Sequence, residues 1–173
     1  TSELLNSPII TQAVPEAATP DNPLMPSGQH WLRASVAKES DAVCRLLGLD
    51  CANASVYDGG TALFEGAMMA VRQTKRRKLV VCETLNPIYR VMLASYTANL
   101  NLEFVTVPHS QGRSDLAGLA KAVDDQTAAV LVQNPNFFGC VTDFAALFQG
   151  ARAKGAVSVI SVYPVLQSVL KTP

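Results

Sequence analysis

The chain has 173 residues, the length of one ordinary domain, so we expect one main hydrophobic core. Its 14 Lys and Arg offset its 14 Asp and Glu. This balance excludes bulk attraction to nucleic acid or to an anionic membrane surface as a primary function. The charged fraction, 16%, is below the roughly 25% usual for soluble domains. We therefore expect another subunit, or another part of the protein, to cover much of the surface, and we expect an oligomer.

The chain contains no run of about 18 apolar residues, so no membrane span is predicted. Residues 1–6 lack a basic region followed by an apolar one, so no signal peptide is predicted. The cysteines, Cys44, Cys51, Cys82 and Cys140, form no C-x-x-C pair and have no His at zinc-finger spacing. We expect reduced, structural thiols in a cytoplasmic protein, and no metal site.

Proline marks the beginning of the chain, and no helical or alternating pattern is sustained there. The pattern predicts an extended proline-rich arm over residues 1–30, followed by an α/β domain over residues 31–173. The prolines of the arm are Pro8, Pro15, Pro20, Pro23 and Pro26.

After the arm, short apolar runs alternate with segments of helical periodicity. Strands are predicted at residues 79–82, 103–107, 128–132 and 156–162. Helices are predicted at residues 31–47 and 61–73, and from the caps Asn86, Ser114 or Asp115, and Thr142. Nearly continuous hydrophobic strands separated by helices indicate a three-layer, mostly parallel sheet with right-handed crossovers. In such sheets, ligands bind at the carboxyl ends of the strands.

One candidate loop precedes the helix predicted from residue 61. Gly59 and Gly60 let backbone N–H groups approach an anion, the helix N-terminus adds partial positive charge, and Thr61 offers a hydroxyl, so a phosphate could bind here. The simpler interpretation, favoured on composition alone, is that Asp58 or Thr61 caps the helix and the glycines form a turn. The spacing matches neither a Walker loop nor a dinucleotide fingerprint.

A second candidate loop follows the strand at 128–132 and reads Gln-Asn-Pro-Asn-Phe-Phe-Gly over residues 133–139. Asn134 and Asn136, with the aromatic pair Phe137 and Phe138, could line a pocket or a subunit contact. Turn chemistry with the two phenylalanines anchored in the core is the simpler alternative.

Several segments together resemble the glycine cleavage system P-protein family, specifically the N-terminal-type subunit of its two-subunit form. The resemblance implies the type I, aminotransferase-like fold of pyridoxal-phosphate enzymes, with this chain forming part of the large domain. It also implies a complex that decarboxylates glycine and passes the aminomethyl group to the lipoyl arm of the H-protein. The matching segments are residues 47–50, 53–55, 57–59, 61–62, 74–78 and 133–139.

The resemblance implies that Asp58, Gly59, Gly60 and Thr61 correspond to a phosphate cradle. It also implies that a lysine-bearing partner subunit carries the pyridoxal phosphate, and none is expected on this chain alone. No catalytic residue is assigned. Lys171 is the last lysine, but it matches a family segment that is not the lysine site.

The chain departs from the family at the position where members tend to show Val-Asp-Pro, because Tyr163 stands there. It also has Ala18 and Asp21 where family members carry tyrosines in the arm. Two hypotheses follow. The chain is an enzyme component that supports a catalytic partner subunit, or it is a non-catalytic scaffold or degenerate paralogue with the same fold.

A basic run, residues 75–78 with Arg72, could meet an acidic partner such as the H-protein, although a solvated helix end is the simpler interpretation. His30 and His109 lack the neighbours of a hydrolase triad or of a metal site.

Overall fold

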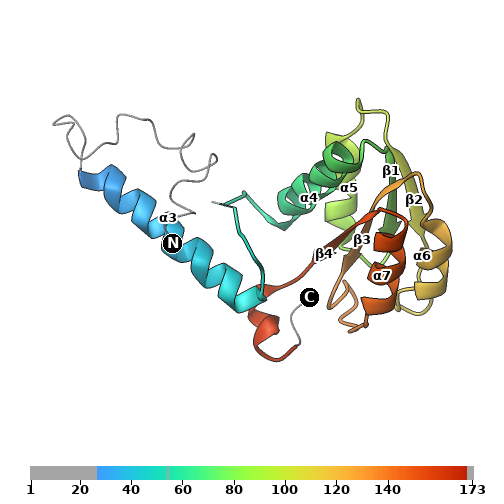
Figure 1. Ribbon diagram of the computed structural model, residues 1–173. Helices are drawn as coiled ribbons and strands as arrows, with labels where there is room; N and C mark the ends of the chain where they lie inside the picture. The colour runs from blue at the N-terminus through green and yellow to red at the C-terminus, as the bar shows by residue number, and fades with distance from the viewer. Residues whose placement is uncertain (1–26, 54, 171–173) are drawn as a thin grey trace. The chain divides into compact units, whose positions relative to one another are not determined.

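The computed structural model describes residues 27–53 and 55–170 (Figure 1). The predicted arm over residues 1–30 lies outside this part of the chain, apart from residues 27–30, which begin a helix. The described residues divide into two compact units. One unit contains the residues up to Ser55 together with those from Pro164 onward, and the other runs from Val56 to Tyr163.

The first unit contains helix α3 (Ser27–Leu47) and the short 3-10 helix η1 (Pro164–Ser168), which packs against it. The helix predicted at residues 31–47 is confirmed, although it begins four residues earlier, at Ser27. Gly48 ends it as predicted, with a φ of 66° that glycine adopts without strain. The Leu49 N–H then donates to the Cys44 carbonyl at 2.9 Å, which closes the helix end.

The second unit alternates helix and strand throughout, as predicted. A single four-stranded sheet has the order β2-β1-β3-β4, and every neighbouring pair is parallel. The strands lie within two residues of their predicted bounds. The elements are α4 (Gly59–Thr74), β1 (Lys78–Cys82), α5 (Pro87–Tyr96), β2 (Glu103–Val107), α6 (Leu116–Ala122), β3 (Thr127–Gln133), α7 (Ala145–Ala153) and β4 (Val157–Ser161).

Helices cover both faces of this sheet, with α4 and α5 on one face and α6 and α7 on the other (Figure 1). Successive residues of a strand point to opposite faces, so Leu79 packs toward α4 and α5 while Val80 packs toward α6 and α7. Every residue of β3 is buried. This two-sided burial explains why the inner strands are continuously apolar in sequence.

Two of the predicted helix caps are confirmed. The Asn86 side chain accepts a hydrogen bond from the Ile88 N–H at the start of α5, and Asp115 accepts one from the Gly118 N–H at the start of α6. The prediction that Thr142 caps α7 is wrong, because the helix starts at Ala145 with Phe144 at the cap position.

The physical reason is that the backbone of Thr142 is bound elsewhere. Its N–H donates to Asn134 Oδ1 and its carbonyl accepts from Asn134 Nδ2, each at 3.1 Å. Asp143 instead accepts from the Ala145 N–H at 2.9 Å. The side chain of Asn134 thus delays the start of the helix.

Candidate functional site

The carboxyl edge of the sheet brings the two predicted loops to one end of the second unit. Helix α4 leads into the amino end of β1, so its own N-terminus, with residues 58–61, lies at the carboxyl edge. The loop at residues 134–139 leaves the carboxyl end of β3. Tyr163, which follows β4, and Tyr89, in the first turn of α5, lie at the same edge. Sequence reasoning had not singled out Tyr89.

Asp58 is the N-cap of α4. Its Oδ1 accepts a hydrogen bond from the Thr61 N–H at 2.7 Å, and its backbone carbonyl accepts one from the Ala62 N–H at 2.9 Å. The simpler interpretation of this loop therefore accounts for Asp58. The N–H groups of Gly59 and Gly60 belong to the first turn, where no helical carbonyl can accept their hydrogen bonds. A role of residues 58–61 in cofactor binding stays a prediction.

The two glycines of this loop lie directly against α5. A methyl group built on Gly59 would lie 2.5 Å from the Tyr89 hydroxyl oxygen. A methyl group built on Gly60 would lie 2.5 Å from Met92 Sδ and 2.8 Å from its Cε. Both separations are far shorter than van der Waals contact. A side chain at either position would therefore force the Tyr89 or Met92 side chain to move.

The hydroxyl of Tyr89 is held in its neutral form. Burial raises the pKa of the phenol, and the neighbouring Tyr163 phenol and Asp58 carboxylate raise it further. A phenolate would be less well solvated there than in water and would be repelled by Asp58. Tyr89 therefore presents a neutral hydroxyl to the start of α4.

The amide groups of the second loop are used within the loop itself. Asn136 is 4% exposed, its Oδ1 accepts from the Phe138 and Cys140 N–H groups at 3.0 Å, and its Nδ2 donates to the Gly112 carbonyl at 2.8 Å. The side-chain amide of Asn134 is bonded to the backbone of Thr142. Phe137 and Phe138 are each 51% exposed, so they are not the core anchors of the simpler interpretation.

Two further polar side chains lie at this edge: Gln133, the first residue of the second predicted loop, and Glu83, which the sequence did not single out. Gln133, only 2% exposed, accepts from the Asn86 N–H at 2.9 Å through its Oε1. Glu83 accepts from the backbone N–H of His109 at 3.0 Å. A buried polar residue at the last position of an apolar strand was the signal available for Gln133.

The described lysines of the second unit lie at the opposite, amino edge of the sheet. Lys78 Nζ donates to the Ala122 carbonyl at 2.9 Å and to Asp124 at 2.6 Å, and Lys154 Nζ donates to the Val123 carbonyl at 2.6 Å. These two lysines therefore bond to the ends of neighbouring elements. The remaining two, Lys75 and Lys121, lie at the C-terminal ends of α4 and α6.

The basic run at residues 75–78 is also partly structural. Arg76 Nη1 donates to the carbonyls of Thr127, at 3.0 Å, and Lys154, at 2.8 Å. Arg77 Nη1 donates to the Leu100 carbonyl at 3.2 Å. Side chains of this run thus donate hydrogen bonds to backbone carbonyls of other segments at the amino edge.

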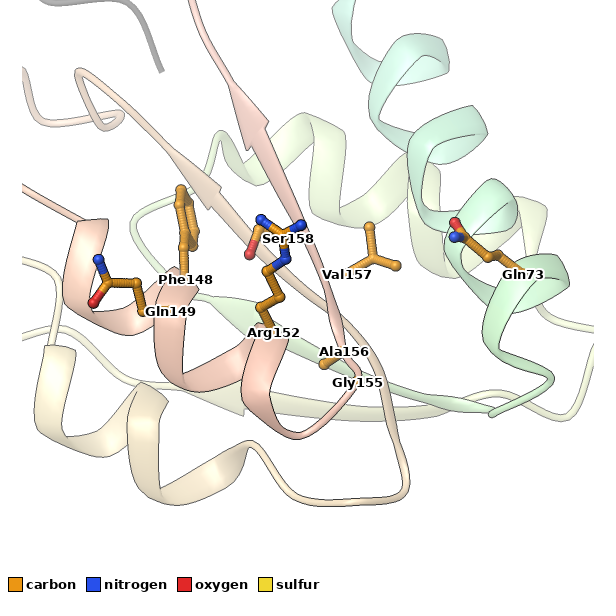
Figure 2. Close-up of a pocket in the computed structure, with 8 residues that line it drawn as sticks. All are labelled: Gln73, Phe148, Gln149, Arg152, Gly155, Ala156, Val157 and Ser158. Atoms are coloured by element: carbon orange, nitrogen blue, oxygen red, sulfur yellow. The ribbon is translucent and has the colours of Figure 1, made fainter.

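A groove of about 530 Å³ opens at the amino half of β4, away from the predicted loops (Figure 2). Figure 2 shows α7 on one side of it and α4 on the other. None of the predicted site residues lines it. Its walls include Phe148, Gln149 and Arg152 from α7, Val157 and Ser158 from β4, and Gln73 from α4.

Within residues 27–53 and 55–170, no three His, Cys, Asp or Glu side chains are grouped so that they could hold a metal ion. In the same part of the chain, no helix has the length and apolar character needed to cross a bilayer. All four cysteines are free thiols.

Comparison with solved structures identifies the fold. A crystal structure of the glycine decarboxylase (P-protein) of the glycine cleavage system, in inhibitor-bound form, superposes with a TM-score of 0.80 and 32% identity, covering 96% of this chain and 38% of that one. A NifS-like protein superposes with a TM-score of 0.61, covering 80% of this chain and 40% of that one. At 15% identity, the second match shows the fold alone. The predicted type I fold of pyridoxal-phosphate enzymes is confirmed.

Sequence comparison identifies the family. A curated relative from Nitratidesulfovibrio vulgaris, named probable glycine dehydrogenase (decarboxylating) subunit 1, is 62% identical over 158 residues. Those residues are 91% of this chain and 36% of that protein, so the chain spans about a third of its relative's length. The sequence model of the glycine cleavage system P-protein family matches residues 29–173. The chain therefore belongs to the glycine cleavage system P-protein family.

Proposed function

We propose that this chain is part of a glycine dehydrogenase (decarboxylating) subunit 1. It acts with a second P-protein subunit to release CO₂ from glycine and to pass the aminomethyl group to the lipoyl arm of the H-protein. The observation that carries the proposal is the family match over residues 29–173, together with 62% identity to a relative of that name.

The residues described here do not fit pyridoxal phosphate as a resident cofactor. That cofactor needs a lysine amine for its Schiff base, donors for its phosphate and a charged partner for its ring nitrogen. The described lysines of the sheet unit all lie at the amino edge, and Tyr163 offers a phenol instead of a carboxylate. The phenol at Tyr163 is the feature of this chain that supports a partner subunit as the carrier of the cofactor.

An exposed apolar surface supports a partner of some kind. Ile88 and Val91 on α5 are 66% and 68% exposed, and Met69 on α4 is 62% exposed. These side chains belong to the helix layer that α4 and α5 form on one face of the sheet. Apolar groups gathered on one layer are typical of an interaction surface, and the low charge of the chain is consistent with this.

The test is the exchange of the glycine carboxyl carbon with labelled bicarbonate. The protein is mixed with a lysine-bearing P-protein subunit and lipoylated H-protein, and exchange is compared with mixtures lacking one component. We expect exchange only with all three present. Undiminished exchange without this protein would contradict the proposal.

A second candidate function is a scaffold that holds the partner without affecting its chemistry. Tyr163, in place of a carboxylate, favours it, because a neutral phenol cannot balance a positive ring nitrogen. The scaffold predicts that the complex forms in sedimentation experiments while exchange stays at the level of the partner alone.

A further inference from the structure

Three side chains converge on the first turn of α4. The Asp58 carboxylate lies 2.7 Å from the Thr61 N–H. The Tyr89 hydroxyl lies over Gly59, and the Met92 thioether lies over Gly60, each at 2.5 Å from the position of a built methyl group. Two of these groups come from α5, so the arrangement depends on helix packing as well as on the loop.

A phosphate group at this helix start would meet two obstacles. The Thr61 N–H, one of the donors that a bound anion would use, already donates to a carboxylate. That carboxylate also carries the same sign of charge as the phosphate, so the two groups would repel each other. The N-terminus of α4 therefore already binds an anion, the Asp58 carboxylate.

The space beside the glycines is also filled. Glycine pairs leave room for a ligand when nothing stands over their α-carbons. Here the Tyr89 side chain stands over Gly59 and the Met92 side chain stands over Gly60. The glycine pair thus serves the contact between α4 and α5.

We propose that Asp58, next to the glycines packed against Tyr89 and Met92, is a built-in anion that excludes phosphate groups, including that of pyridoxal phosphate, from the start of α4. The glycine loop resembles a phosphate cradle in sequence, but its helix N-terminus is then capped by its own aspartate. This inference depends on the proposed function only for the identity of the excluded phosphate ester.

The test is a titration of the protein with inorganic phosphate and with pyridoxal phosphate, followed by calorimetry and by ³¹P line broadening. Asp58→Asn keeps a capping oxygen and removes the charge, and Asp58→Gly removes the side chain where glycine is a tolerated cap. We expect only weak phosphate binding at this position by the unaltered protein. We expect phosphate binding to strengthen in the order wild type, Asn, Gly, with at least a tenfold gain for Asp58→Gly.

Asp115→Asn is the matched control. Asp115 caps α6 in the same way, with Oδ1 2.9 Å from the Gly118 N–H, but α6 has only seven residues. This variant should lose the same kind of cap charge and gain no phosphate affinity. Circular dichroism checks that each variant is folded, and the Asn variant keeps the test informative if the Gly variant unfolds.

Saturable phosphate binding by the wild type that Asp58→Gly abolishes or leaves unchanged would overturn the inference. So would the absence of any gain in both Asp58 variants. The bicarbonate exchange assay is independent of these titrations. If exchange fails while phosphate affinity still rises from wild type to Asp58→Asn to Asp58→Gly, the proposed function is contradicted and the inference about Asp58 is not.

Discussion

Asn136 should stabilise the fold far more than an ordinary loop residue does. Its buried amide makes three hydrogen bonds, from the Phe138 and Cys140 N–H groups and to the Gly112 carbonyl. A typical hydrogen bond contributes about 1 kcal/mol net, and a buried group left unpaired costs more. Asn136→Ala should therefore lower the free energy of unfolding by about 3 kcal/mol. That is a large share of the roughly 5–15 kcal/mol typical of a domain.

The assay is urea denaturation followed by circular dichroism, with Asn136→Asp as the companion variant. Aspartate keeps both acceptor contacts but turns a charged, buried oxygen toward the Gly112 carbonyl, so a loss at least as large as that of Asn136→Ala is expected. Pyridoxal phosphate should not change the unfolding midpoint of either variant. A loss below about 0.5 kcal/mol for Asn136→Ala, the range of ordinary surface substitutions, would refute the reasoning.

Three further predictions concern packing and charge. Gly60→Ala should destabilise the fold by about 1–2 kcal/mol through overpacking, and Met92→Ala in the same chain should relieve part of that loss in a double-mutant cycle. Arg76→Ala should cost about 1–3 kcal/mol, because two backbone carbonyls lose a charged donor; Arg76→Lys, measured by the same urea curves, should recover only part. The hydrogen bond from Lys78 lowers the pKa of Asp124 to about 2, so its stabilisation is complete above the ordinary carboxyl pKa and is lost as the pH falls from about 4 toward 2. Asp124→Asn should flatten that part of the acid unfolding curve, and an unchanged curve would contradict the assignment.

Local periodicity was enough to predict the elements of the second unit. The strands are apolar runs bounded by turns, and Asn86 and Asp115 cap helices through residues two or three positions away. Such short-range chemistry can be read from the sequence. The start of α7 could not, because Asn134 holds the backbone of Thr142 from the far side of a loop.

The candidate site was predictable only in part. The sequence placed the residues at 58–61 before a helix and those at 134–139 after a strand. It could not show that Tyr89, from the next helix, lies over Gly59, because that contact depends on how two helices pack. The contacts of Lys78 and Lys154 were likewise not predictable, since their carbonyl partners, Ala122 and Val123, are distant in sequence.

The outer strand β4 has a consequence for how a preparation of these residues behaves. Among the described strands it is hydrogen-bonded only to β3, and it contains no proline or charged residue to discourage further pairing. Strand β2, at the other side, begins with Glu103. Polymerisation by strand addition should therefore proceed at β4. A preparation of these residues alone should form elongated, sheet-rich particles as its concentration rises.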